Sequence, residues 1–375
     1  MKDLKRYPVM LLLFGVIGLF FILNLLTPAK AFSEMENRYL SQRPEFSLSA
    51  IADSSSKGYA QKFEQYVNDQ FALRDRWISL KSRCEALLGK TENNGIIYGG
   101  DGYLFEKFRS YDAQRLEKNL GFLAEFAAMN PDINKYVMIV PGSYNILSTL
   151  TPKGLGNIDQ LPLIRTINDR LAQSSGYTGV DVSANLLAHT DEQLYYRTDH
   201  HWTTQGAWYG YESFMHATGR AALLPETSLA HSAEGFWGTY YSKAKKFDAA
   251  ADIITWYDLP VSGVKIDDAP VDSMYDTAAL ETRDKYALFL HANNGVTVIQ
   301  NDNAPKGAIM IIKDSYANCF VPFLTQSYQK VVVVDLRSLP KGVNALIKTE
   351  QIQDVLVLYS FSNLSSDTNM PRIRY

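Results

Sequence analysis

Hydrophobic and polar residues follow two different periods along most of the chain. Continuous apolar runs indicate buried strands, and apolar residues three or four positions apart indicate amphipathic helices. Strands are expected at 135–140, 179–182, 253–258, 285–290, 295–299, 308–312, 331–334 and 355–359. Helices are expected at 113–129, 161–173, 206–216 and 343–348. Because buried strands alternate with helices, this order predicts an α/β fold with a parallel sheet covered on both faces.

The first 30 residues differ from the rest of the chain. An apolar run at 8–26 follows three basic residues, Lys2, Lys5 and Arg6. The run is long enough to cross a bilayer, and the basic flank directs the N-terminus toward the cytoplasm. The small residues of Ala29-Lys30-Ala31 also suit cleavage of a signal peptide after Ala31, which would make the protein secreted. The run is long for a signal peptide, so we favour a single-pass anchor in the cell membrane. Either interpretation exports the remaining residues.

We therefore expect three parts: an anchor or signal peptide at 1–30, an extracytoplasmic tether at 31–56 and a folded extracytoplasmic domain at 57–375. A helical period fills 57–88, where Asp69 and Arg74 are expected to pair across a turn. Strand-like residues around a glycine turn indicate a hairpin at 96–105. The segment 234–246 is expected to be mainly loop.

Composition narrows the class of function only slightly. The 375 residues carry a net charge of −3, which gives no argument for nucleic-acid binding. The two cysteines, Cys84 and Cys319, have neither metal-type spacing nor a disulfide framework. Nothing in the sequence calls for a cofactor. The 23 tyrosines are compatible with a carbohydrate-facing cleft, although aromatic residues more often fill a core.

The densest group of chemically active residues is Thr198-Asp199-His200-His201-Trp202, which follows two tyrosines. The tyrosines favour a strand, and Thr203 and Thr204 suit the N-cap of the helix that follows. Residues two apart on a strand face the same side. We therefore expect Asp199 and His201 to share one face at a strand-to-helix junction, with His200 pointing elsewhere in a structural role and Trp202 in the core.

A second candidate, Ser315, comes two residues after the apolar strand at 308–312. This position is at the carboxyl edge of a sheet, where active sites form. If a helix starts there, its first backbone N–H groups could stabilise an oxyanion. A serine hydroxyl becomes a nucleophile when an imidazole takes its proton, and a carboxylate orients the imidazole. Ser315, His201 and Asp199 supply these three roles.

Other interpretations of these residues remain open. Asp199, His200 and His201 could bind a metal, but no further ligand pair accompanies them, and we expect none. Arg197 could contact a substrate or pair with a nearby acid. Tyr144 and Trp237 could line a glycan groove or pack in the core. Tyr316, directly after Ser315, is a further candidate for substrate or oxyanion contact.

The Thr-Asp-His-His-Trp segment, with Glu36-Asn37-Arg38 and Phe236-Trp237-Gly238-Thr239, resembles the DHHW family of exported proteins. More distantly, the chain is similar to SGNH-hydrolase-like alginate O-acetylation proteins. Asn68-Asp69-x-Phe71-x-x-Arg74 and Asp101-Gly102-Tyr103-Leu104-Phe105 match early motifs of that group, with Tyr103 where Trp is usual. The resemblance implies an SGNH-hydrolase-like fold over 57–375.

The same resemblance implies a triad of Asp199, His201 and Ser315. It also implies an oxyanion role for Asn293, although Ala292 replaces the usual Gly of a Gly-Asn motif. Lys313 replaces a small residue that usually precedes Asp-Ser.

Relatives of this kind receive acyl groups from a membrane-bound O-acyltransferase. The implied function is a cell-surface O-acetyltransferase that acts on an exported polysaccharide through acyl-Ser315. A carbohydrate esterase with the same triad and a non-catalytic glycan-binding protein are the alternatives.

Overall fold

The computed structural model describes residues 7–47, 49, 58–339 and 342–375. The basic residues Lys2, Lys5 and Arg6 and positions 48 and 50–56 of the expected tether lie outside this part of the chain. The described residues form two compact units, one containing 1–91 and 245–248 and the other containing 92–244 and 249–375. The expected domain boundary at residue 57 stays a prediction.

An eight-stranded sheet forms the centre of the larger unit, and its strand order is β11-β10-β12-β14-β13-β15-β6-β7. The five strands from β14 to β7 are parallel, and the other three extend the sheet in antiparallel fashion. The strands are β6 (Asn134–Val140), β7 (Tyr177–Val180), β10 (Gly263–Ile266), β11 (Ala269–Val271), β12 (Val296–Gln300), β13 (Ala308–Lys313), β14 (Lys330–Val334) and β15 (Asp354–Ser360). The predicted α/β class is confirmed.

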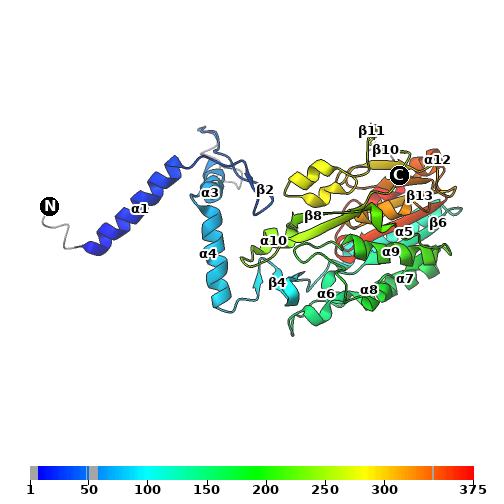
Figure 1. Cartoon of the computed structure of the whole chain (residues 1–375), viewed down its shortest axis with the longest axis horizontal. Coiled ribbons are helices and arrows are strands. Elements are labelled where there is room, and N and C mark those ends of the chain that lie inside the picture. Colours follow the sequence, from blue (N-terminus) through cyan, green and yellow to red (C-terminus); the bar gives the residue numbers. More distant parts are fainter. Residues whose placement is uncertain (1–6, 48, 50–57, 340–341) are drawn as a thin grey trace. The chain divides into compact units, whose positions relative to one another are not determined.

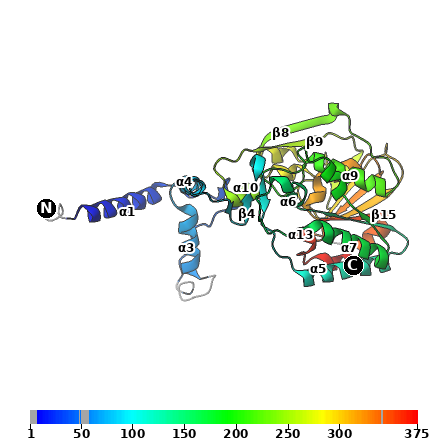
Figure 2. The same cartoon turned by 90° about the horizontal axis from the view of Figure 1, so that it is seen from below.

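Each central strand contributes to two cores because alternate side chains point to opposite faces of a sheet. Met310 and Val332 pack with α5 (Ala113–Met129), α7 (Gln160–Ser175) and α12 (Val343–Thr349). Ile309 and Val331 pack on the other face with α9 (Thr204–Ala217). Figure 2 shows α5 and α7 on one side of the sheet and α9 on the other. The helices predicted here are confirmed, and the Thr203 side chain caps α9 by accepting a hydrogen bond from Gly206 N.

Two predictions of local structure in the larger unit are wrong. The segment expected as a strand at 285–290 is the 3-10 helix η6 (Lys285–Leu288), since a short apolar run has no period that separates strand from helix. The expected loop at 234–246 contains the end of β8 (Ala230–Phe236) and helix α10 (Thr239–Ala244). β8 pairs only with β9 (Asp252–Tyr257), outside the large sheet. The hairpin at 96–105 is confirmed as β4 (Ile96–Tyr98) and β5 (Leu104–Glu106), and β3 (Glu92–Asn93) pairs with β4.

The smaller unit begins with α1 (Pro8–Leu26), which is long and apolar enough to cross a membrane. A short pair of strands, β1 (Phe32–Ser33) and β2 (Arg38–Tyr39), follows it. The helical period predicted at 57–88 corresponds to two helices, α3 (Tyr59–Gln70) and α4 (Arg74–Leu87) (Figure 1). The break occurs at Leu73, whose φ is 59°. Ala72 N, which the break frees from helical bonding, donates to Asn24 Oδ1 at 2.8 Å.

The early motifs meet in an ion cluster within the smaller unit. Asp69 pairs with Arg38 at 2.5 Å, and Arg74 pairs with Glu36 at 2.8 Å, so the expected pair between Asp69 and Arg74 is wrong. Lys245 also pairs with Glu36. Burial raises the pKa of Glu36, but the hydrogen bonds from Arg74 and Lys245 outweigh burial and hold that pKa below its ordinary value. The cluster therefore keeps a half-buried carboxylate ionised.

Candidate active site

Asp199, His201 and Ser315 form one continuous chain of hydrogen bonds. His201 Nδ1 lies 2.5 Å from Asp199 Oδ1, and His201 Nε2 lies 2.8 Å from Ser315 Oγ. Ser315 begins the 3-10 helix η7 (Ser315–Cys319) directly after β13. With Nδ1 protonated and donating to Asp199, the Nε2 lone pair accepts from the Ser315 hydroxyl. The three residues predicted from the sequence are thus brought together in the geometry of a nucleophile, a base and an orienting carboxylate.

The segment that carries Asp199 and His201 is a closed loop and not the expected strand. Tyr195 and Trp202 form an isolated antiparallel bridge, and Tyr196 N donates to His201 O at 3.2 Å. Trp202 is fully buried, as predicted, and its indole Nε1 donates to Tyr316 O at 2.8 Å. That bond ties the histidine loop to the segment that carries the serine.

A buried carboxylate accepts three hydrogen bonds from this loop. Asp252, the first residue of β9, accepts from Arg197 N at 2.9 Å, Thr198 N at 2.8 Å and Thr198 Oγ1 at 2.6 Å. Burial raises the pKa of Asp252 above its ordinary value, and these hydrogen bonds oppose that rise. Removing Asp252 would leave buried N–H groups without an acceptor.

The Phe-Trp-Gly-Thr motif supplies the other partners of Asp199. Thr239 donates to Asp199 Oδ2 from its backbone N at 2.7 Å and from its hydroxyl at 3.1 Å. Gly238 permits this approach, because a Cβ there would lie 2.1 Å from Asp199 Cβ. This motif enters the sequence analysis only through the family resemblance, which assigns Gly238 and Thr239 no role.

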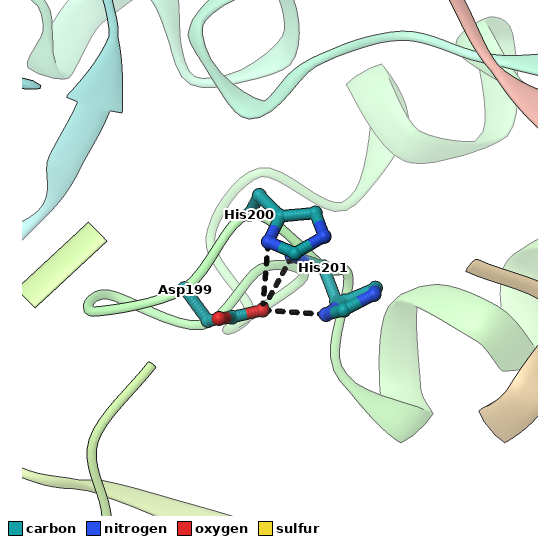
Figure 3. Close-up of side chains that lie close together, drawn as sticks. All are labelled: Asp199, His200 and His201. Atoms are coloured by element: carbon teal, nitrogen blue, oxygen red, sulfur yellow. Dashed lines mark hydrogen bonds and ion pairs between the residues drawn. The ribbon is translucent and has the colours of Figure 1, made fainter. Parts of the chain in front are cut away.

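His200 does not point away from the site, contrary to expectation. Its ring lies over that of His201, with centroids 3.7 Å apart, and both rings face Asp199 (Figure 3). His200 Nδ1 is 2.8 Å from Thr239 Oγ1 and 3.4 Å from Asp199 Oδ1. The prediction of opposite faces required an extended strand, and the closed loop removes that geometry.

The two imidazoles differ in their affinity for protons. Burial lowers the pKa of His201, and the neighbouring His200 lowers it further, to about 4. Burial also opposes protonation of His200, but the Asp199 carboxylate outweighs burial and raises the pKa of His200. Burial acts against ionisation of Asp199 as well, yet the two histidines hold its pKa well below the ordinary value. A proton shared by the pair therefore resides on His200, and His201 stays neutral and able to act as a base.

Tyr286 contacts both His201 and Ser315, and sequence reasoning missed it because 285–290 was taken as a strand. Its ring is stacked on His201, with centroids 3.9 Å apart and an interplanar angle of 10°. Its hydroxyl donates to Ser315 O at 3.0 Å. The side chain is buried, so the position of its ring is set by packing with neighbours such as Phe289. No local sequence signal indicates this role.

The backbone donors near Ser315 are fewer than predicted. Tyr316 N donates to Asp314 Oδ1 at 2.9 Å, and Ala317 N donates to Asp314 O at 3.2 Å. Both are already used, because Asp314 caps the short helix. Ser315 N has no acceptor among the described residues. It is the backbone group that remains for an oxyanion.

The side-chain oxygen of Asn293, the predicted oxyanion residue, is hydrogen-bonded to Lys313. Asn293 Oδ1 accepts from Lys313 Nζ at 2.6 Å, and Asn318 Oδ1 accepts from the same amine at 2.7 Å. Burial lowers the pKa of Lys313 to about 8. The lysine that departs from the family pattern therefore joins the Asn293 loop to η7. Ala292 has a φ of 70°, which explains why glycine is usual there.

The remaining candidates have structural contacts. Tyr316 is buried and its hydroxyl donates to His200 O. The Arg197 side chain donates to Asp101 O at 3.1 Å and lies over the Tyr103 ring, and no acid pairs with it in the described part of the chain. Tyr144 is in the core and not in a groove. Trp237 is partly exposed, and the centroid of its ring lies 4.2 Å from that of Tyr241. A substrate contact stays a prediction for Trp237.

The three residues Asp199, His200 and His201 also offer ligand atoms within 4.8 Å of one another. Each of these side chains already has a hydrogen-bond partner: Thr239 for Asp199 and His200, and Ser315 for His201. An ion at this position would have to replace those bonds. The arrangement is therefore better suited to proton transfer than to metal binding.

We expect Gly238→Ala to displace Asp199, because the new methyl group would overlap the aspartate backbone and side chain. Overpacking of this kind costs about 1–3 kcal/mol of unfolding free energy. Thermal denaturation of the variant measures this loss. Gly121→Ala in α5 is the matched control, since no atom lies within 4 Å of its new methyl group. Equal stability of the Gly238→Ala variant and the wild type would contradict the close approach.

We expect His200→Gln to raise the pKa of His201 above about 4, because the substitution removes a neighbouring positive charge. Glutamine can still donate to Thr239. NMR titration of the imidazole carbons of His201 measures this pKa, and His216, on α9, is an internal reference. An unchanged or lower pKa of His201 would show that the two rings do not compete for a proton.

Comparison with known proteins identifies the family. The family model described as "DHHW protein" matches residues 121–334. No curated protein matches this chain in sequence. A DHHW family protein from Eubacterium siraeum is 24% identical, with 75% of this chain and 95% of that chain covered and a TM-score of 0.64.

Two further solved structures are similar to this chain. Bacillus cereus PatB1, solved with a sulfonyl adduct, is 21% identical, with 75% of this chain and 98% of that chain covered and a TM-score of 0.59. The O-acetyltransferase domain of Pseudomonas putida AlgJ is 16% identical, with 73% and 93% covered and a TM-score of 0.46. The family match spans more than half of the chain, and it confirms the resemblance seen in the motifs: the chain belongs to the DHHW family.

Proposed function

We propose that this protein is a membrane-anchored, extracytoplasmic O-acetyltransferase that modifies an exported polysaccharide through an acetyl-Ser315 intermediate. The observation that supports the proposal most directly is the hydrogen-bonded chain from Asp199 through His201 to Ser315. Its two distances are those of a base poised between a nucleophile and an orienting carboxylate. The motif resemblance to alginate O-acetylation proteins makes acetyl the acyl group we expect.

The first half-reaction transfers the acetyl group to the enzyme. Ser315 Oγ attacks the carbonyl carbon of the donor while its proton moves to His201 Nε2. Ser315 N–H is placed to donate to the developing oxyanion, and Asp199 stabilises the imidazolium through Nδ1–H. Collapse of the tetrahedral intermediate breaks the bond to the donor oxygen or sulfur, which takes the proton from His201.

The second half-reaction passes the acetyl group to a sugar hydroxyl. His201 removes the hydroxyl proton as the sugar oxygen attacks the ester, and the proton then returns to Ser315 Oγ when the C–O bond breaks. Water in place of the sugar would give an esterase, the alternative function. An N-terminal anchor would keep the domain beside a membrane-bound O-acyltransferase, which we propose as the source of the acetyl group.

Tyr286 is proposed as a positioning residue for both groups. Its ring fixes the plane of the His201 imidazole, and its hydroxyl fixes the backbone of Ser315. An aromatic face also favours the imidazolium that forms in each step, by about 0.5–2 kcal/mol in a desolvated site. The residue acts through its neighbours and does not touch the reacting atoms.

We expect Ser315→Ala and His201→Ala to abolish acetylation of the enzyme, because each removes one member of a unit that works together. Losses of about 10⁴-fold or more in kcat are typical for such groups. Intact mass after treatment of the full-length protein with an aryl acetate would show one added acetyl group in the wild type. Phenylmethylsulfonyl fluoride gives a second label on the same oxygen, with loss of fluoride.

The exposed Ser228→Ala variant is the matched control and should behave as the wild type. An added oligosaccharide then separates the functions: acetyl on the sugar supports a transferase, and free acetate alone supports the esterase. Labelling that persists in Ser315→Ala would show that another group is the nucleophile.

We expect Tyr286→Phe to lower kcat about fivefold, since one hydrogen bond contributes about 1 kcal/mol. Tyr286→Leu should lower kcat further, because it also removes the ring from His201. Steady-state hydrolysis of the aryl acetate measures both variants, and KM should change little if only positioning is lost. Circular dichroism checks that both variants are folded. Equal kcat values for Phe, Leu and Tyr at this position would contradict the positioning role.

A further inference from the structure

Helix α4 in the smaller unit carries an apolar stripe that the proposed reaction does not use. Trp77, Leu80, Cys84 and Leu87 follow one another at steps of three, four and three residues, which places them on one face of the helix. The exposed fraction is 42% for Trp77, 50% for Leu80 and 88% for Leu87. An exposed face of this length on a soluble surface requires a partner.

Basic side chains border the stripe. At 100° per residue, Arg76 and Arg83 lie along one edge and Lys81 along the other. Glu85, the acid nearest to Lys81, is shared between Lys81 at 3.8 Å and Lys90 at 2.9 Å. Basic side chains at these edges could contact anionic lipid headgroups if the stripe faces a bilayer.

Contacts with α1 fix where this stripe begins. The ring of Phe20 in α1 stacks on Phe71 at 5.7 Å and lies 5.6 Å from the ring of Trp77. Asn24 in α1 accepts from Ala72 N at 2.8 Å. Phe20 is six residues from the end of α1 at Leu26, which corresponds to about 9 Å along a helix. Phe71 and Trp77 are therefore level with the last two turns of α1.

The length of α1 sets the depth of those turns. Its 19 residues extend about 28 Å, close to the hydrocarbon thickness of a bilayer of about 30 Å. If α1 spans the membrane, its last turns are at the outer boundary of the hydrocarbon. Trp77, which is level with Phe20, then reaches about 9 Å below that boundary, a depth that the apolar face of an interfacial helix reaches. A role for these contacts at the membrane requires that α1 stays attached to the chain.

We propose that the apolar stripe of α4 binds the lipid surface, so that α4 lies in the headgroup region of the outer leaflet. The lipid tails then cover Trp77, Leu80, Cys84 and Leu87, and the basic edges contact anionic headgroups. This proposal does not depend on the triad. It adds a second attachment to the membrane beside α1, and it makes the start of the folded chain lie along the bilayer instead of swinging freely on a tether.

The exposed Cys84 provides a test in the full-length protein, because it lies in the stripe and Cys319 is buried. An environment-sensitive fluorophore on Cys84 is examined after reconstitution in phosphatidylethanolamine vesicles with a minor fraction of phosphatidylglycerol. The matched control carries the fluorophore at Ala86→Cys in a Cys84→Ser background, since Ala86 is also exposed and lies about 160° around the helix. Spin-labelled lipids should quench the probe at Cys84 more than about twofold, and aqueous iodide should quench the probe at position 86.

Three outcomes would overturn the proposal. Iodide quenching at Cys84 equal to that at position 86 would show that the stripe faces water. Protection of Cys84 from both quenchers would show that protein covers it, whether a second copy or another membrane protein. Unchanged lipid quenching in a Leu80→Gln, Leu87→Gln variant would show that the stripe does not drive the contact. Ser315 acetylation is measured on the same samples, so failure of the lipid contact and failure of the enzyme proposal are separate results.

Discussion

The site depends on one carboxylate that is buried and fully hydrogen-bonded. A buried charge is tolerated only where donors surround it, and Asp199 receives His201 N, His201 Nδ1, Thr239 N and the Thr239 hydroxyl. Each donor comes from a backbone position that something else fixes. Asp252 fixes the histidine loop, and Gly238 lets the Thr239 backbone come close enough. The geometry of the base is therefore a property of three segments and not of the Asp-His-His-Trp motif alone.

The two histidines beside Asp199 differ in pKa, and this difference bears on which ring can accept a proton. An imidazole beside a buried carboxylate tends to hold a proton, and a protonated base cannot accept one from Ser315. His200 shares Asp199 and has the raised pKa, so the proton stays on the ring that does not face the serine. Thr239 serves both rings, because its hydroxyl accepts from His200 and donates to Asp199.

Sequence patterns predicted the central strands of the sheet, and the motifs predicted the three residues Asp199, His201 and Ser315 that the fold brings together. These patterns were insufficient where spacing carries no information. The runs at 308–312 and 355–359 are long and wholly apolar, so their strands were predictable. The run at 285–290, which contains Tyr286, is of similar length but begins with Lys285, and only the fold decides that it contains a 3-10 helix. The prediction for His200 was wrong for a related reason. The direction of a side chain follows from the shape of the backbone, and the bridge between Tyr195 and Trp202 closes this segment into a loop.

The N-terminal motif residues form ion pairs that extend to Lys245, a residue close in sequence to the Phe-Trp-Gly-Thr motif. Glu36, Arg38, Asp69 and Arg74 belong to one ion cluster, and its remaining cation is Lys245. Lys245 directly follows α10, and α10 begins with Thr239, which holds Asp199. Thr239, which bonds to Asp199, therefore lies six positions before Lys245, which pairs with Glu36. Glu36 and Arg74 are thus linked by charge to a residue that directly follows α10, although they supply no chemistry to the candidate site.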